Sequence, residues 1–301
     1  MPLIVPANIP FTPDVYEECV SSLAAKYPCM DVTVIGTSRK GRPIYSLSLG
    51  YGPIAYMYNA AHHANEWITA VLLTRFGEDC AKEIHQVWQS WVGGKQPGEA
   101  WPQSPWYERV TLHLVPMVNP DGVEMVTTGA GYDGWKANAC GVDLNSNYPA
   151  GWELAKAHKY ARGYTAPGPR DYVGPRPLCE PESLAMAAYT KLVDPAMTLS
   201  LHTQGEEIYW RYRDYMPPGA WALARRLSHV SGYILEEVPD ESSHAGYRDW
   251  FIEEFNRPGF TIECGLGESP LPVSDFDGIY EKVRPLMMEG LGLPFRLSLR
   301  G

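Results

Sequence analysis

The amino-acid sequence predicts a single α/β domain in which helices cover a mixed, mainly parallel sheet. Short apolar segments rich in β-branched and aromatic residues alternate with longer segments that have the apolar spacing of helices, and this alternation is typical of such folds. Hydrophobic residues make up 45% of the 301-residue chain, which is enough for a sizeable core. The sequence contains no internal repeat, low-complexity tract or long charge run, so we interpret residues 1–301 as one domain.

The first part of the chain is expected to contribute a lead-in helix within residues 1–30, then three strands and a long helix. Apolar residues repeat with the period of a helix over residues 67–91, and Asn65 just before them is a candidate N-cap. Residues 93–104 are rich in glycine and proline and are predicted to form a surface loop. The three strands are expected at 31–35, 44–49 and 54–59.

The second part of the chain begins with a predicted strand over residues 110–117, which should end at the turn signal Asn119-Pro120-Asp121-Gly122. Residues 127–177 show little periodicity and much glycine, proline and tyrosine, so we expect an irregular substrate-side region. Further helices are predicted at 181–192, 220–231, 247–255 and 277–289, and further strands at 197–202 and 259–264.

The composition argues against two classes of partner. The formal net charge of −10 disfavours nonspecific binding to nucleic acid or to an anionic membrane, which needs basic surface. No stretch approaches the ~20 apolar residues of a membrane span. The N-terminal segment is broken by prolines and lacks the basic and apolar regions of a secretory signal. A cytoplasmic location with six reduced cysteines is therefore expected.

Candidate metal ligands fall at the ends of predicted strands. His63 and Glu66 are three residues apart, so they can lie on the same side of a helical turn and converge on one metal ion. A catalytic zinc usually takes three protein ligands, and His202, at the end of the strand over residues 197–202, is the best third candidate. In open α/β sheets ligands bind beyond the carboxyl ends of the strands, so we expect these residues to meet there, close to Glu263.

Five motifs that follow one another along the chain resemble those of the zinc metallocarboxypeptidase family. The resemblance implies a sheet of about eight strands and one zinc ion held by His63, Glu66 and His202. It also implies that Glu263 is the general base acting on zinc-bound water and that Asp143 accepts a hydrogen bond from the first zinc histidine. The alternative for Asp143 is an aspartate that forms a turn. The motifs, spread over about residues 35–271, are His63-x-x-Glu66, Asn119-Pro120-Asp121-Gly122, Gly141-Val142-Asp143-Leu144-Asn145, His202 and Glu263.

Three departures from the family pattern concern substrate binding. Carboxypeptidases hold the C-terminal carboxylate of the substrate with an Asn-Arg pair, but here Asn145 is followed by Ser146, so the charge-assisted clamp is missing. Lys136 follows Trp135 where the family has its oxyanion arginine, and it either takes a weaker form of that role or is a solvated lysine. The mobile-loop tyrosine of the digestive enzymes has no clear counterpart, and Tyr247, at a different spacing, is the candidate substrate contact.

Arg248 stands where the resemblance places the residue of the specificity pocket. A cation at the base of that pocket would select an acidic side chain on the residue after the cleaved bond. The alternative is a surface arginine paired with Glu253 or Asp249. Four segments resemble one branch of the family, the bacterial γ-D-glutamyl-L-diamino acid endopeptidases. They are residues 65–69, 135–138, 202–206 and 265–268.

This resemblance implies a zinc metallopeptidase that hydrolyses the bond between γ-D-glutamate and meso-diaminopimelate in peptides derived from peptidoglycan. Arg248 would contact the extra carboxylate of diaminopimelate, and cytoplasmic turnover of muropeptides is the expected role. One alternative is a broad-specificity zinc carboxypeptidase, against which Ser146 argues. The other is a non-catalytic zinc-containing peptide-binding protein, against which the presence of Glu263 beside three metal ligands argues.

Overall fold

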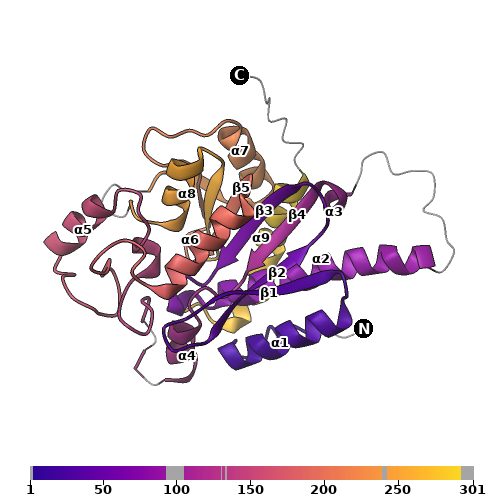
Figure 1. Ribbon diagram of the computed structural model, residues 1–301, viewed down its shortest axis with the longest axis horizontal. Helices are drawn as coiled ribbons and strands as arrows, with labels where there is room; N and C mark the ends of the chain where they lie inside the picture. Colours follow the sequence, from indigo (N-terminus) through magenta and orange to yellow (C-terminus); the bar gives the residue numbers. More distant parts are fainter. Residues whose placement is uncertain (1–2, 93–104, 130, 133, 239–242, 293–301) are drawn as a thin grey trace.

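A mixed sheet of eight strands forms the centre of the computed structural model, which describes residues 3–92, 105–129, 131–132, 134–238 and 243–292 (Figure 1). The mixed sheet and its strand number agree with the expectation. The strands are β1 (Met30–Thr37), β2 (Pro43–Leu49), β3 (Ile54–Ala60), β4 (Val110–Val115), β5 (Met197–His202), β6 (Glu207–Tyr209), β7 (Ile234–Glu236) and β8 (Gly259–Glu263).

The order of the strands across the sheet is β1-β2-β4-β3-β5-β8-β6-β7. The four central strands β4, β3, β5 and β8 are parallel, and so is the pair β6–β7. The pairs β1–β2, β2–β4 and β6–β8 are antiparallel. Because the central strands are parallel, their carboxyl ends lie at one edge of the sheet, and the segments that follow them can meet there.

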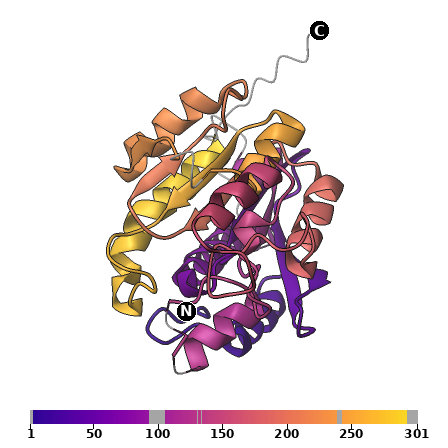
Figure 2. The ribbon, with the colours of Figure 1, turned by 90° about the vertical axis from the view of Figure 1, so that its left-hand side faces the viewer.

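Helices cover both faces of this sheet, as Figures 1 and 2 show from two directions. One face packs against α2, α7 and α9, with α1 beside β1 and α4, and the other face packs against α6 and α8. The helices are α1 (Pro13–Lys26), α2 (Ile68–Val92), α3 (Trp106–Arg109), α4 (Pro120–Thr128), α5 (Trp152–Ala161), α6 (Pro181–Val193), α7 (Ala220–Ser231), α8 (Tyr247–Phe255) and α9 (Phe276–Gly292).

The core consists of two main apolar layers, one on each face of the sheet. Successive side chains of a strand point to opposite faces. Along β3, Tyr56 and Tyr58 therefore join the layer under α2 and α9, whereas Met57 joins the layer under α6 and α8. All three side chains are fully buried. This continuous burial is typical of a parallel strand covered on both faces.

The structure corrects three local expectations. The segment that starts with Pro120 is the first turn of α4 rather than a turn after β4, and the Asn119 side chain caps it by accepting a hydrogen bond from Gly122 N at 3.0 Å. Asn65 is not an N-cap, because it lies within a 3₁₀ turn over Ala64–Glu66 that precedes α2. The region 127–177 is not irregular throughout, because it contains the ten-residue helix α5.

Two short strands, β6 and β7, were not expected from the sequence, because three residues are too few for a periodic signal. The predicted loop at 93–104 lies outside the described residues. In the part of the chain that the structure describes, no helix is both long and apolar enough to cross a membrane.

Candidate metal centre

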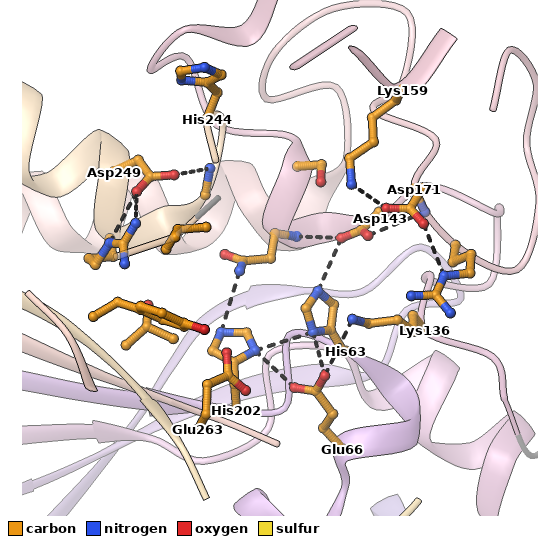
Figure 3. A pocket seen from close by; sticks show the side chains of 18 of the residues that line it. His63, Glu66, Lys136, Asp143, Lys159, Asp171, His202, His244, Asp249 and Glu263 are labelled. Atoms are coloured by element: carbon orange, nitrogen blue, oxygen red, sulfur yellow. Dashed lines mark hydrogen bonds and ion pairs between the residues drawn. The ribbon is translucent and has the colours of Figure 1, made fainter. Parts of the chain in front are cut away.

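The carboxyl ends of β3, β5 and β8 bring the expected metal ligands and the expected base together (Figure 3). His63 and Glu66 follow the end of β3, His202 is the last residue of β5, and Glu263 is the last residue of β8. His202 and Glu263 are neighbours in the register of the parallel pair β5–β8. Four residues from three distant parts of the sequence thus face one pocket.

The turn between His63 and Glu66 is held by hydrogen bonds on both sides. His63 has an extended backbone, and the 3₁₀ turn over Ala64–Glu66 then places Glu66 beside the His63 ring. The Thr69 hydroxyl donates to Glu66 O at 2.6 Å and accepts from Ala61 N at 3.0 Å. Ala64 N donates to Lys136 O at 3.0 Å, which ties the turn to the next loop. These contacts fix the direction of both side chains before any ligand binds.

Three buried donors converge closely enough to hold one metal ion. Atoms of His63, Glu66 and His202 that can act as ligands all lie within 4.8 Å of one another. The two carboxylate oxygens of Glu66 lie 2.8 Å from His63 Nδ1 and 2.9 Å from His202 Nδ1, and the two ring nitrogens are 3.2 Å apart. Two imidazoles and a carboxylate form a donor set suited to catalytic zinc. Facing ring nitrogens around one carboxylate therefore fit a small divalent cation.

Asp143 lies behind His63 and accepts from the ring nitrogen that faces away from the other donors. Its Oδ1 is 3.2 Å from His63 Nε2 and also accepts from Asn145 N at 3.1 Å. Burial alone would raise the pKa of Asp143, but the His63 ring and the Lys136 ammonium hold it well below its usual range. A charged carboxylate in this position fixes the ring orientation and leaves Nδ1 of His63 directed at the metal position.

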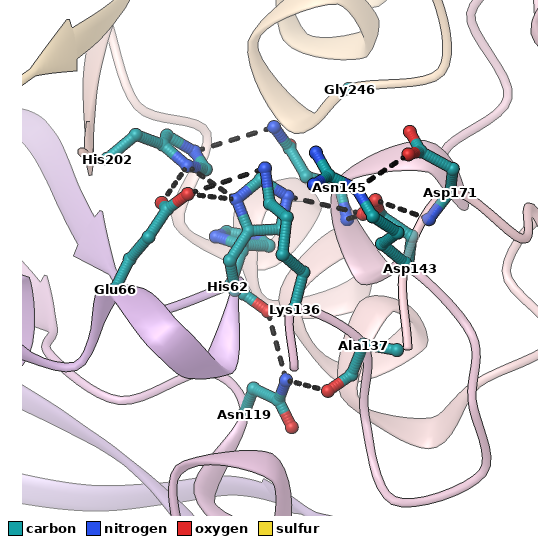
Figure 4. Close-up of polar contacts among 12 residues, drawn as sticks. His62, Glu66, Asn119, Lys136, Ala137, Asp143, Asn145, Asp171, His202 and Gly246 are labelled. Atoms are coloured by element: carbon teal, nitrogen blue, oxygen red, sulfur yellow. Dashed lines mark hydrogen bonds and ion pairs between the residues drawn. The ribbon is translucent and has the colours of Figure 1, made fainter. Parts of the chain in front are cut away.

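The surrounding loops are joined by one buried amide. Asn119 Nδ2 donates to His62 O and to Ala137 O, both at 3.1 Å (Figure 4). His62 itself does not face the pocket, because its Nε2 contacts the Tyr148 hydroxyl at 3.0 Å. Asn119 of the Asn-Pro-Asp-Gly motif therefore joins the loop of His62 and His63 to the loop of Lys136 and Ala137, and it also caps α4.

Glu263 and Lys136 carry the other ionisable groups next to the three donors. Burial and the nearby Glu66 carboxylate raise the pKa of Glu263 to about 8. Lys136 Nζ lies 3.5 Å from Glu66 Oε1. Burial lowers the pKa of Lys136, but the carboxylates of Glu66, Asp143 and Glu263 outweigh that effect and raise it. Lys136 is therefore a charged ammonium inside the pocket, not a solvated lysine.

Arg248 lines the same pocket and is buried there. Its Nε donates to Asp249 Oδ1 at 3.0 Å, its Nη2 contacts the same oxygen, and its guanidinium lies 5.7 Å from the centre of the Tyr209 ring. Arg248 Nη1 is buried and has no hydrogen-bond partner among the described residues. The sequence left two possibilities for Arg248, a pocket residue or a surface arginine paired with Glu253 or Asp249. Arg248 does pair with Asp249, but it is buried in the pocket and is therefore not a surface arginine.

The other expected substrate contacts divide into two that line the pocket and one that does not. Asn145 and Ser146 line it, and Asn145 Nδ2 lies 3.5 Å from His202 Nε2. Tyr247 does not face it, which corrects the sequence-based expectation. Its side chain is fully buried under α6, with the hydroxyl 2.9 Å from Thr190 Oγ1 and 3.3 Å from Met57 Sδ. Its backbone N–H donates to Asn145 Oδ1 at 3.0 Å, so it positions Asn145 instead.

The cavity has a volume of about 410 Å³, and several of its lining residues had not been identified from the sequence. Lys159 and Asp171 form a buried ion pair, and Arg170 Nε lies 2.9 Å from the other Asp171 oxygen. No motif marks these residues. The single signal in the sequence was that residues 127–177, which contain them, should line a binding surface. The residues not predicted individually include Lys159, Arg162, Arg170, Asp171, Thr203, Tyr209, Val238, Gly246 and Thr261.

Comparisons with known proteins agree with this geometry. A model described as zinc carboxypeptidase matches residues 16–284. The chain is 40% identical over 292 residues to gamma-D-glutamyl-L-diamino acid endopeptidase 1 from Lysinibacillus sphaericus, covering 91% of this chain and 70% of that protein. It is 37% identical over 296 residues to the uncharacterized protein YqgT from Bacillus subtilis (strain 168), covering 91% and 75%. The crystal structure of thrombin activatable fibrinolysis inhibitor has the same fold, with a TM-score of 0.73 at 17% identity over 93% of this chain and 73% of that chain.

Proposed function

The chain belongs to the zinc carboxypeptidase family, and we propose that this member hydrolyses the bond between the γ-carboxyl group of D-glutamate and a diamino acid in peptides derived from peptidoglycan. It is a zinc-dependent hydrolase, as the family is, and it carries the buried His-Glu-His site. The observation that carries the substrate assignment is the combination of Ser146 and Arg248 in one pocket. The 40% identical relative, named for this activity, supports it.

We assign the zinc ligands to His63, Glu66 and His202, and the orientation of His63 to Asp143. A zinc ion held there supplies an activated water and polarises the carbonyl group of the substrate. The chain's own contribution is to hold the donors in place. The contacts of Thr69 with the turn and of Asp143 with His63 do this before substrate arrives.

Glu263 is the proposed base. It lies at the end of β8 beside His202 and lines the pocket, so its carboxylate can take a proton from the attacking water and pass it to the leaving amine. Lys136 remains charged beside Glu66 and is suited to stabilise the negative charge that develops on the carbonyl oxygen. A lysine offers a point charge rather than a planar pair of donors, so its binding of that oxygen is less directional than an arginine's.

The choice of the residue after the cleaved bond is assigned to Arg248. Diaminopimelate differs from lysine by an additional carboxylate at the end of its side chain. Arg248 Nη1 is a buried donor without a partner among the described residues, so a carboxylate there would satisfy it. Asp249 holds the guanidinium from the other side. Ser146 offers no positive charge to the C-terminal carboxylate of a peptide. The substrate therefore need not end at the residue that follows the cleaved bond.

The test is to digest L-Ala-γ-D-Glu-meso-diaminopimelate with the zinc-loaded protein and to identify the products by mass spectrometry, with and without a chelator. We expect cleavage only at the γ-D-glutamyl bond and only with metal. The lysine counterpart should be cleaved with a kcat/KM roughly 10- to 100-fold lower, the range expected for one hydrogen bond to a charged group. Release of C-terminal residues from ordinary peptides instead would contradict the proposal.

The variant Arg248→Gln should remove the discrimination between the diaminopimelate and lysine peptides. Arg257→Gln is the matched control, because Arg257 lies just after α8 and pairs with Asp194 outside the pocket. It should leave the discrimination unchanged. If Arg248→Gln still prefers diaminopimelate by the wild-type factor, Arg248 is not the selecting residue. The cytoplasmic location stays a prediction, and fractionation of cells that produce the full-length protein would test it.

A further inference from the structure

We propose that Arg170 binds the free α-carboxylate of the γ-linked glutamate, the residue before the cleaved bond. This inference rests on the proposed function and extends it to the other side of the metal. A glutamate linked through its γ-carboxyl group keeps a charged α-carboxylate, which two methylene groups and the α-carbon separate from the reacting carbonyl. The protein should therefore have a second cation for the substrate, in addition to Arg248.

Arg170 lies in the right part of the pocket for this role. Both Arg248 and Arg170 line the cavity, and each contacts an aspartate that follows it in the chain. In Figure 3 these aspartates, Asp249 and Asp171, lie on opposite sides of the metal donors His63 and His202. Because each guanidinium contacts its aspartate, the two cations lie on opposite sides of these metal donors, beside which the reacting carbonyl would bind. A substrate that reaches Arg248 with the residue after the bond would extend towards Arg170 with the residue before it.

The backbone around Arg170 is fixed to the metal site. The preceding carbonyl, Pro169 O, accepts hydrogen bonds from Lys136 N at 2.8 Å and Ala137 N at 3.0 Å. The following amide, Asp171 N, donates to Asp143 Oδ2 at 3.3 Å. Arg170 is therefore held between two residues that are themselves attached to the catalytic centre. It is not part of an untethered surface loop.

The guanidinium of Arg170 has donors left for a ligand. Its Nε is engaged by Asp171, but no hydrogen bond from its two terminal nitrogens to a described residue is present, and 52% of the side chain is exposed. Asp171 is also paired with Lys159, so its single negative charge serves two cations. Lys136 lies close to Glu66, and a bound metal ion would share the carboxylate of Glu66 with it. The cluster of Lys159, Asp171 and Arg170 thus carries one positive charge in excess, which an incoming carboxylate would neutralise.

A matched pair of peptides tests the inference with almost no change in substrate size. One is L-Ala-γ-D-Glu-meso-diaminopimelate, and the other carries an α-carboxamide in place of the α-carboxylate. With the zinc-loaded wild-type protein we expect kcat/KM to be roughly 10- to 100-fold lower for the carboxamide, as for the loss of a charged hydrogen bond, with most of the change in KM. Arg170→Gln should lower kcat/KM for the carboxylate peptide to the level of the carboxamide and change the carboxamide value little.

Arg176→Gln is the matched control, because it removes the same charge from an exposed residue of the same loop outside the pocket. It should keep the wild-type preference. An unchanged kcat/KM of Arg170→Gln for the carboxamide peptide shows that the loop around Asp171 is intact. An unchanged zinc content of this variant shows that the metal site is intact. Binding of both peptides to the Glu263→Gln variant, measured by calorimetry, gives the same comparison without turnover.

The inference fails if the wild-type protein cleaves or binds both peptides equally, or if Arg170→Gln retains the preference for the carboxylate. Neither result affects the proposed function, because the γ-D-glutamyl bond is still cut in both cases. Absence of cleavage at that bond in either peptide would instead refute the proposed function itself. The two failures are therefore distinguishable in one experiment.

Discussion

The buried ion pair between Lys159 and Asp171 gives the most quantitative prediction for the stability of this site. Both residues are buried, and Lys159 comes from α5 whereas Asp171 lies in the loop that contacts Asp143. Lys159→Met leaves the Asp171 carboxylate with Arg170 as its remaining charged partner. Loss of one member of a buried pair costs about 3–5 kcal/mol, and because Arg170 still contacts one Asp171 oxygen at 2.9 Å we expect about 3 kcal/mol. At about 2–4 °C for each kcal/mol, the melting temperature should fall by roughly 6–12 °C.

The assay is urea unfolding of the zinc-loaded protein, with Lys156→Met as the matched control. Lys156 lies on the same helix but contacts the rings of Trp152 and Tyr160 rather than a carboxylate, so its loss should cost at most about 1 kcal/mol. The double variant Lys159→Met with Asp171→Asn removes both buried charges and leaves only Arg170, whose side chain is half exposed, without its carboxylate, so it should recover most of the lost stability. If the double variant is as unstable as Lys159→Met alone, the buried carboxylate left without Lys159 is not the cause and the reasoning is wrong.

Three further predictions concern the base, the metal and one histidine remote from the pocket. Glu263→Gln should lower kcat by about 10²- to 10⁴-fold with unchanged zinc content, measured by turnover and metal analysis, because the proton acceptor is lost; retention of turnover would show that another group is the base. Removal of zinc should lower the free energy of unfolding by about 2.7 kcal/mol relative to protein at a free zinc concentration of 100 times Kd, measured by urea unfolding, and readdition should restore it. Burial lowers the pKa of His113 below 6.5, so the stability linked to it is present above pH 6.5 and is lost as the pH falls below that value. His113→Gln can still meet Ser48 Oγ and Tyr189 OH, and it should show a smaller loss of unfolding free energy than the wild type between about pH 7 and pH 5; an equal loss would exclude His113 as a contributor.

The sequence predicted best those elements whose side chains have a strong period. The bounds of β5, α7 and α8 agree with the expected ranges, because their apolar residues repeat clearly between glycines and prolines. The helix α5 was missed because its only large apolar residues are Trp152, Leu154 and Tyr160 and because glycine-rich segments lie on both sides of it. The Asn119 motif was taken for a turn because proline and glycine also mark turns. Its actual role depends on the contact of the Asn119 side chain with Gly122.

The site shows the same division between local and long-range information. His63, Glu66, His202 and Glu263 could be predicted because they carry ordered motifs at strand ends. Arg170 could not be predicted, because its place beside Lys136 results from hydrogen bonds between loops that are more than thirty residues apart in the sequence. Tyr247 was misassigned for a related reason. Its position next to Arg248 is visible in the sequence, but the direction of its side chain is set by packing against Thr190.

The distribution of charge in the pocket explains how an acidic protein can be suited to an anionic peptide. The chain carries a net charge of −10, so its long-range field should repel such a substrate. Beyond a Debye length of about 8 Å at physiological salt that repulsion is largely screened. Inside the pocket, Arg248 and Arg170 act at contact distance, where screening is weak. In the proposed function these two residues bind carboxylates on either side of the cleaved bond, and Ser146 leaves the chain end without a cation. A positive charge is then needed beside the substrate's side groups rather than at its terminus, which is the arrangement an endopeptidase requires.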